Sequence, residues 1–344
     1  MNNVLVVGGA GFIGVNLALH LKSKEINTVA LDDLSRYGSE INKQLIEKEG
    51  IDFIEGDITN KQFIEELFTN YNFSSIVNLA GQVAMTTSIE DPTYDLSVNL
   101  FGTHNILEGI RKLSPETSII YTSTNKVYGD LEWDEYLEKD TRYESSNFPK
   151  GYDESLSLNF SGPYGCSKGA AEQYVLDYYK TFSLDTTVLR LSTIYGPHQY
   201  SNFNQGWIGW FIGEILKQKE NKEIKIEIAG DGKQVRDILH VNDLSSLITK
   251  LILKEGSGET GGQPFNVGGG IENALSILEL IEYLKVLLDI EQEINIVNNP
   301  WRPADQKYYV SNNEKIYKFT DWSVVTGKEN GIKNYTEWII NNET

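Results

Sequence analysis

Cysteine is almost absent from this chain of 344 residues, which contains only Cys166. A single cysteine excludes an intrachain disulfide and a thiolate metal cage. Histidine is also scarce, and the spacing of His198 and His240 is not typical of metal ligands. We therefore expect no bound metal and a cytoplasmic location, where thiols stay reduced.

Basic residues are fewer than acidic ones. The chain has 30 lysines and arginines against 49 acidic residues, which gives a formal net charge of −19. Such a surface repels nucleic acid and anionic membranes, so we expect neither as a partner. If a ligand carries phosphates, the few arginines that meet it have to be placed specifically.

Long apolar runs are missing too. No stretch of about 18 residues is free of polar interruption, so no membrane span is expected. Residues 4–21 are mostly apolar but lack a basic leader, and their glycines fall at the spacing of a nucleotide-binding turn. We therefore do not interpret this segment as a secretory signal.

What the sequence does contain is an alternation of short apolar runs with segments of helical periodicity. The expected strands are 4–7, 28–31, 52–57, 75–80, 118–123 and 187–191. The expected helices between them are 12–23, 62–68, 99–111 and 163–182. This order predicts an α/β fold with a doubly wound parallel sheet of the Rossmann type.

The composition changes after residue 196, which predicts a second part of the chain. We expect a dinucleotide-binding domain at 1–196, with an insertion over the active-site rim at 131–162. Residues 197–344 are expected to form mainly a smaller C-terminal α/β substrate-binding cap, with some segments returning to the first domain. Trp207 and Trp210 either fill the core of this cap or stack on a base, and core packing is the default.

The first strand runs directly into a glycine-rich turn and a helix. Gly8 and Gly11 permit a tight turn whose amides approach a pyrophosphate, and Gly14 lets the helix pack close to the sheet. The phosphates would lie at the positive end of that helix. The alternative is a glycine turn without a ligand, but the strand–turn–helix context favours a dinucleotide site.

Asp32 ends the second strand, where the adenosine ribose is expected. A carboxylate there accepts from both ribose hydroxyls and rejects a 2′-phosphate, which favours NAD over NADP. Arg36 favours NADP instead, because an arginine nearby accommodates that phosphate. The segments 57–58 and 80–82 either flank the cofactor or form ordinary strand-end turns.

Tyr164 and Lys168 lie four residues apart at the start of a helix, so they share one face. A nearby ammonium and an oxidised nicotinamide ring both favour the tyrosinate, which makes Tyr164 a candidate general base. Thr124 ends the fifth strand and offers a hydroxyl to the same substrate oxygen. Cys166 lies between the two helix residues, and we expect it to be a small buried residue rather than a nucleophile.

Three stretches carry a specific family resemblance, namely 123–130, 162–171 and 204–211. With the GxxGxxG spacing of the first turn, they make the chain similar to extended short-chain dehydrogenase/reductases of the nucleotide-sugar epimerase/dehydratase type. The resemblance covers essentially the whole chain. It implies a bound NAD that is reduced and reoxidised within one turnover, and a nucleotide-sugar substrate, a CDP-sugar being favoured. It also implies a homodimer or homotetramer that pairs the helices starting near Asn99 and Pro163.

One departure from the relatives bears on the reaction. The 4,6-dehydratases of this superfamily carry an Asp-Glu pair directly after the catalytic threonine, and here the positions hold Asn125 and Lys126. The resemblance therefore implies epimerisation through a transient keto sugar rather than loss of water. It favours oxidation at C2, although the same residues serve C4 equally well. The remaining alternatives are a nucleotide-sugar dehydratase, an oxidoreductase that releases its reduced cofactor, and a non-catalytic NAD-binding protein.

The complete set of candidate residues falls into three groups. The expected catalytic residues are Thr124, Tyr164 and Lys168. The expected cofactor contacts are Gly8, Gly11, Phe12, Ile13, Gly14, Asp32, Asp57, Ile58, Ala80, Gly81, Gln82, Asn99, Tyr164 and Lys168. The expected substrate contacts are Asn125, Lys126, Gln205, Arg236 and Arg302. The two arginines are expected to bind the diphosphate, and the alternative is that each forms only a surface ion pair.

Overall fold

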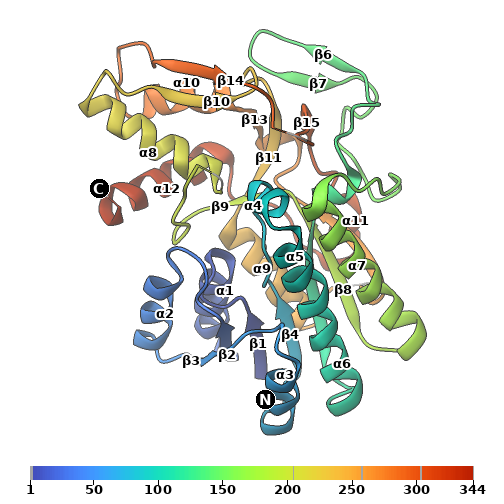
Figure 1. The fold of residues 1–344 in the computed structure, drawn as a ribbon. Coiled ribbons are helices and arrows are strands. Elements are labelled where there is room, and N and C mark those ends of the chain that lie inside the picture. The colour runs from blue at the N-terminus through green and yellow to red at the C-terminus, as the bar shows by residue number, and fades with distance from the viewer. Residues whose placement is uncertain (1–2, 204, 257–258, 303, 344) are drawn as a thin grey trace.

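The computed structural model describes residues 3–203, 205–256, 259–302 and 304–343, and its centre is a seven-stranded sheet (Figure 1). Every neighbouring pair in this sheet is parallel. From edge to edge the strands are β12 (Gln263–Val267), β8 (Thr186–Leu191), β5 (Ser118–Thr124), β4 (Ser75–Asn78), β1 (Asn3–Val7), β2 (Asn27–Asp32) and β3 (Asp52–Glu55). The chain order reverses between β1 and β4, and ligands of doubly wound sheets bind at the carboxyl ends of the strands there. The predicted fold class is confirmed.

Helices cover both faces of the sheet, as the alternation of strand side chains requires. Along β1, Leu5 and Val7 enter one hydrophobic cluster while Val4 and Val6 enter the other. Because both faces are buried, the strand is apolar throughout. One face carries α1 (Phe12–Ser23), α9 (Val241–Ile252) and, beside α1, α2 (Ser39–Lys48). The other face carries α3 (Lys61–Asn70), α6 (Thr103–Leu113) and α7 (Gly162–Phe182).

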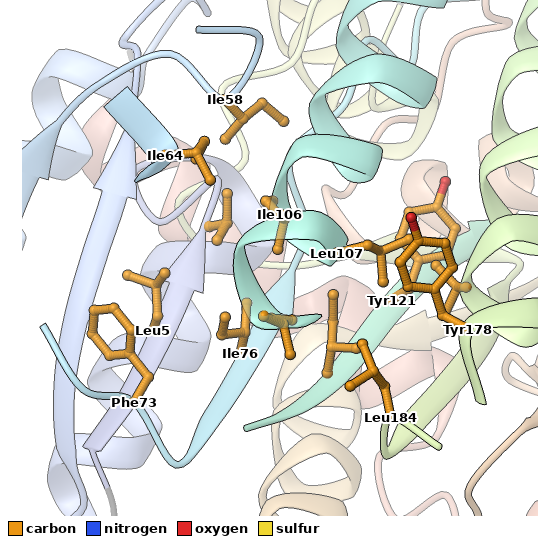
Figure 2. Packing of buried hydrophobic residues seen from close by; sticks show 14 of the residues in the cluster. Leu5, Ile58, Ile64, Phe73, Ile76, Ile106, Leu107, Tyr121, Tyr178 and Leu184 are labelled. Atoms are coloured by element: carbon orange, nitrogen blue, oxygen red, sulfur yellow. The ribbon is translucent and has the colours of Figure 1, made fainter. Parts of the chain in front are cut away.

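The cluster beneath α6 shows how tightly the second face is packed. In Figure 2, Ile106 and Leu107 of α6 lie against Leu5, Ile76 and Tyr121 of the sheet. All five are at most 1 % exposed. Burial of each such side chain contributes about 1.5–3 kcal/mol, so this interface holds α6 and the sheet in a fixed relation.

The C-terminal part of the chain builds a smaller layer above the carboxyl ends of the strands (Figure 1). Its strands are β9 (Thr193–Tyr195), β10 (Ile226–Ala229), β11 (Val235–His240), β13 (Ala274–Ser276), β14 (Ile296–Asn299) and β15 (Tyr308–Tyr309). Its helices are α8 (Trp207–Glu220), α10 (Ile277–Leu287) and α12 (Lys328–Asn342). Trp207 and Trp210 pack against the core of this layer. The chain returns to the central sheet through α9, β12 and α11 (Glu314–Thr320).

The segment 131–162 is ordered rather than a featureless loop. It forms a hairpin of β6 (Tyr136–Glu138) and β7 (Tyr143–Ser145). Phe148 and Tyr152 then pack with Tyr308 and Tyr309 in a separate aromatic cluster. The insertion is thus anchored to the C-terminal layer.

Sequence patterns missed several short or irregular elements. The helices α2, α8, α11 and α12 were not expected, nor were α4 (Met85–Glu90) and α5 (Pro92–Leu96). The helix expected to begin at Asn99 starts instead as a π-helical turn at Ser97–Gly102 that continues into α6. Short 3₁₀ helices lie at Asn125–Tyr128 and Ile271–Asn273. Among the described helices, none is long and apolar enough to cross a membrane.

The expected burial of Cys166 was wrong, because the side chain is exposed. It lies on α7 between Tyr164 and Lys168, and the face of the helix that meets the sheet is the one that carries Ser167 and Lys168. Its two neighbours along the helix, Gly165 and Ser167, are buried.

A buried ion pair joins α7 to the sheet and predicts a large effect on stability. Arg190 and Glu172 pair at 2.5 Å, with side chains 4 % and 0 % exposed. Replacing Arg190 by Leu leaves the Glu172 carboxylate uncompensated, so the free energy of unfolding should fall by about 3–5 kcal/mol in urea titrations. The control is Lys61→Ala, which breaks an exposed pair with Glu65 and should change little. An equally small effect of Arg190→Leu would contradict the prediction.

Candidate active site

The turn between β1 and α1 requires glycine at two positions. Gly8 has φ +78°, in the left-handed region. A Cβ atom on Gly14 would lie 2.1 Å from the carbonyl oxygen of Gly8, so helix and turn approach as closely as a bare backbone allows. No side chain caps α1, and its first turn contains no acidic residue. The positive end of the helix is therefore available to an anionic ligand.

Asp32 at the end of β2 borders this turn. Its carboxylate accepts hydrogen bonds from the backbone N–H of Ala10 at 3.0 Å and of Leu34 at 2.8 Å. Burial raises the pKa of Asp32, although the two amides and the charge of Arg36 oppose the rise. Each carboxylate oxygen accepts more than one hydrogen bond, so the group can still bind two ribose hydroxyls.

A cavity of about 520 Å³ lies above the carboxyl ends of the strands. This volume is in the range of small-ligand and cofactor sites, about 300–1,000 Å³. The predicted residues that line it are Gly8, Gly11, Phe12, Ile13, Gly14, Asp32, Asp57, Ile58, Ala80, Gly81, Gln82, Thr124, Tyr164, Lys168 and Gln205. The close glycine turn and the ribose-facing carboxylate fit a dinucleotide.

Asn99 lies behind the wall of this cavity and not in it. Its amide nitrogen donates to the carbonyl oxygen of Gln82, to Asp95 and to Ser167. Asn99 has no exposed surface. Its position favours a role in holding α5, α7 and the strand end at Gln82 together, and not the expected direct contact with the cofactor.

The three expected catalytic residues meet at one side of the cavity. Tyr164 and Lys168 come from the first turns of α7, and Thr124 comes from the end of β5, where β5 and β8 are still paired. Lys168 is only 3 % exposed, and its ammonium lies 4.4 Å from the centroid of the Tyr121 ring.

Burial dominates the electrostatics of this group. It lowers the pKa of Lys168 to about 7, although the carboxylates of Asp95 and Glu172 oppose the shift. It raises the pKa of Tyr164, and this rise is opposed by hydrogen bonding with Thr124 and by the charge of Arg36. The isolated protein thus favours a neutral phenol, and a bound cation in the cavity would shift Tyr164 toward the tyrosinate.

Arg36 bridges the cavity. It donates to the carbonyl oxygen of Gly81 at 3.2 Å. With its amide oxygen turned toward Arg36, Gln205 accepts from the same guanidinium at 2.6 Å. Arg36 therefore links the end of β4 to the C-terminal layer, and Gln205 is engaged with protein rather than open to substrate.

The remaining expected substrate contacts do not line the cavity. Lys126 lies 3.5 Å and Arg236 2.7 Å from the carboxylate of Asp305. Asn125 donates to Gln306 at 2.8 Å. Arg302 donates to the carbonyl oxygen of Phe203 and stacks over its ring, at 5.0 Å from the centroid. Asn204 and Pro303, which border this group, lie outside the described residues.

The 304–306 segment and Arg36 are the features that sequence reasoning missed. Asp305 and Gln306 were not singled out, because nothing in their local pattern shows that they contact Asn125 and Lys126. Arg36 was considered only as a partner for a 2′-phosphate. In the described part of the chain, no group of three or more His, Cys, Asp or Glu residues is placed to hold a metal.

The family model for the NAD dependent epimerase/dehydratase family matches residues 4–268. This match covers well over half of the chain, which therefore belongs to that family. The two predictions of family membership and of NAD as the cofactor are confirmed.

Individual relatives refine the comparison. The chain is 43 % identical to the CDP-paratose 2-epimerase of Salmonella typhi over 336 residues, which cover 97 % of this chain and 98 % of that protein. Its structure is similar to UDP-glucose 4-epimerase from Thermotoga maritima with UDP-glucose, at a TM-score of 0.83 and 25 % identity over 99 % and 100 % of the two chains. It is also similar to dTDP-glucose 4,6-dehydratase from Bacillus anthracis in complex with NAD, at a TM-score of 0.79 and 29 % identity over 100 % and 98 %.

Asp32 predicts a cofactor preference that binding measurements can check. Replacing it by Asn removes the negative charge at the ribose position, so affinity for NAD relative to NADP should fall about 10- to 100-fold in calorimetric titrations. Asp153→Asn is the matched control, because the exposed Asp153 side chain binds Ser155 and does not line the cavity. An unchanged ratio for Asp32→Asn would show that another residue sets the preference.

The depressed pKa of Lys126 predicts a pH-dependent stability. Burial lowers this pKa from 10.5 to about 8, so the unfolded chain binds more protons than the folded one between these values. Stability from this group therefore rises as pH increases from 8 to 10.5. Relative to Lys126→Met, the wild type should gain up to about 3 kcal/mol over this window in urea titrations. A difference that stays constant with pH would refute the assignment.

Proposed function

We propose that this chain is an NAD-dependent nucleotide-sugar epimerase that works through a transient keto sugar. The proposed reaction is inversion at C2 of CDP-paratose, which gives CDP-tyvelose. The single observation that carries the enzymatic part is the convergence of Thr124, Tyr164 and Lys168 on the same cavity as the glycine turn. The similarity to CDP-paratose 2-epimerase over nearly the whole chain supports the substrate.

The glycine turn and Asp32 would hold NAD, which would supply the hydride acceptor for oxidation of the sugar and the hydride donor for its reduction. Tyr164 takes the proton of the C2 hydroxyl during oxidation and gives it back during reduction. Lys168, four residues along the same helix face, favours the ionised phenol through its charge when protonated. Thr124 orients the substrate oxygen and stabilises charge that develops on it.

The surroundings of Thr124 support epimerisation over dehydration. The two positions that follow it hold Asn125 and Lys126, so the carboxylic acid pair that the 4,6-dehydratases carry at these positions is replaced. Both side chains contact the 304–306 segment rather than the cavity.

We assign the diphosphate of the substrate to Arg236 and Arg302. Lys126 and Arg236 pair with a single carboxylate, that of Asp305, and the charge of Arg302 also acts on Lys126, so the surplus positive charge suits an anionic ligand. A firmly held diphosphate would let the keto sugar turn over in the cavity without leaving it. Gln205 and the Asn125–Lys126 pair are proposed to complete the substrate site after rearrangement.

The competing candidate is a C4 epimerase acting on a UDP-sugar. The structural similarity to UDP-glucose 4-epimerase favours it, and the catalytic residues serve either carbon.

We further propose a cytoplasmic enzyme of lipopolysaccharide O-antigen biosynthesis. We also propose a homodimer or homotetramer in which α6 and α7 pair with their copies. Exposed Phe101 in the π-helical turn before α6 and exposed Tyr174 and Phe182 on α7 support such an interface. Sedimentation equilibrium would test the assembly.

The reaction can be tested with two substrates and one variant. Incubation with CDP-paratose should give CDP-tyvelose by NMR, without growth of reduced-nicotinamide absorbance, while UDP-galactose should remain unchanged. Tyr164→Phe should lower kcat at least 100-fold, because the general base is lost, with bound NAD retained. Turnover of UDP-galactose alone would favour the C4 reaction. Full activity of Tyr164→Phe would remove the mechanism.

A further inference from the structure

A relay of side-chain amides connects the C-terminal layer to Thr124. The amide nitrogen of Gln306 donates to the carbonyl oxygen of Gly129 at 2.6 Å. The amide nitrogen of Asn125 donates to the Gln306 amide oxygen at 2.8 Å. The hydroxyl of Thr124 donates to the Asn125 amide oxygen at 3.3 Å. Gln306 has no exposed surface, and Asn125 and Thr124 are also buried.

The direction of every hydrogen bond in this relay is forced. A backbone carbonyl only accepts, so the NH₂ group of Gln306 must face Gly129 and its oxygen must face Asn125. The NH₂ group of Asn125 must then face Gln306, which turns its oxygen toward Thr124. Thr124 has a single proton, and in this arrangement that proton points at Asn125.

The oxygen of Thr124 is left as an acceptor. It accepts from the backbone N–H of Lys126 at 3.3 Å. Thr124 also lines the same cavity as Tyr164, and its hydroxyl lowers the pKa of that phenol. While the Thr124 proton faces Asn125, the phenol must donate to Thr124, and this requires a protonated Tyr164. Support for a tyrosinate or for an alkoxide of the substrate requires the Thr124 proton to turn away from Asn125.

The contact between Thr124 and Asn125 is suited to such a turn. Its 3.3 Å length exceeds the usual 2.5–3.0 Å of an O–H···O hydrogen bond, so the bond is weak. An amide oxygen also carries no net charge, whereas a carboxylate at this position would hold the proton more strongly.

We propose that Asn125 and Gln306 are positioning residues that give the Thr124 proton a reversible resting place. The proton faces Asn125 when Tyr164 is protonated, and it rotates about the Cβ–Oγ bond toward Tyr164 or the substrate oxygen when negative charge develops there. No covalent bond is broken in this step. The proposal rests on the proposed role of Tyr164 as general base, and it assigns the 304–306 segment a part in proton transfer.

The alternative is that the two amides only fasten the 304–306 segment to the residues after β5. In that case their loss would lower stability and leave the titration of Tyr164 unchanged. The charged and titratable groups that face Tyr164 are Arg36 from the loop after β2, Asp95 from α5 and Tyr121 from β5, with Lys168 on its own helix. These four groups stay the same in all the variants below.

The test uses Asn125→Leu, which keeps the approximate volume of the side chain but removes the resting acceptor. In the NAD-bound protein, the tyrosinate absorbance of each variant is titrated against pH, and the same variant with Tyr164→Phe is subtracted. Since Thr124 is then free to donate, the proton affinity of Tyr164 should fall about three- to ten-fold. Gln306→Met, which releases the far side of Asn125, should give a smaller change in the same direction.

The decisive control repeats Asn125→Leu in a protein that carries Thr124→Val. If Asn125 acts through Thr124, the shift disappears in this background. A shift that persists undiminished, or no shift in either background, would overturn the proposal. Retained NAD and a cooperative thermal transition show that each variant is folded. Asn72→Leu, in the exposed loop between α3 and β4, is the matched control for the substitution.

This titration needs no substrate, so it separates two kinds of failure. If no nucleotide sugar is turned over but the phenol still responds to Asn125 through Thr124, the proposed function fails and the relay stands. If CDP-paratose is epimerised while the acidic limb of the kcat profile is the same in Asn125→Leu as in wild type, the relay fails and the function stands.

Discussion

The geometry of the candidate active site depends on one buried carboxylate, that of Glu172. It has no exposed surface and accepts from Arg190 of β8 and from Ser123 of β5. Glu172 lies one helical turn after Lys168 and two turns after Tyr164, on the same face of α7. Ser123 directly precedes Thr124. One network of charge-assisted hydrogen bonds therefore fixes the helix that carries the phenol and ammonium against the strand that carries the hydroxyl.

The second constraint is the cost of placing charges in a closed cavity. Burial disfavours the ionised forms of both Tyr164 and Lys168. Arg36 opposes this effect at Tyr164 and Asp95 opposes it at Lys168, but each of the two charges adds to the effect at the other residue. Asp95 is itself held by Asn99, Gln82 and Ser167 behind the cavity wall. A bound nicotinamide cation would favour the ionised form of Tyr164, although the same charge would oppose the ammonium of Lys168.

At the opposite end of the site, positive charges outnumber negative ones. Asp305 is one carboxylate facing Lys126 and Arg236, with Arg302 contributing to the same positive field. In a chain with a net charge of −19, such a local excess of positive charge is a specific feature of the site. Since Asp305 and Gln306 are adjacent, the segment that holds these cations also holds Asn125, and through it the hydroxyl of Thr124.

The local sequence was enough to predict the central sheet, the glycine turn, Asp32 and the three residues that meet at the cavity. Each of these depends on neighbours in the chain: apolar runs form buried strands, glycine spacing sets the turn, and a four-residue interval places two side chains on one helix face. Asn99, Gln205 and the contacts of Asn125, Lys126, Arg236 and Arg302 were decided by tertiary structure. Their partners come from segments up to 181 residues away, as for Asn125 and Gln306, and pairings over that distance leave no local pattern. The sequence determined which chemical groups this protein carries, and the packing of the C-terminal layer on the strand ends decided which of them face the cavity and which face each other.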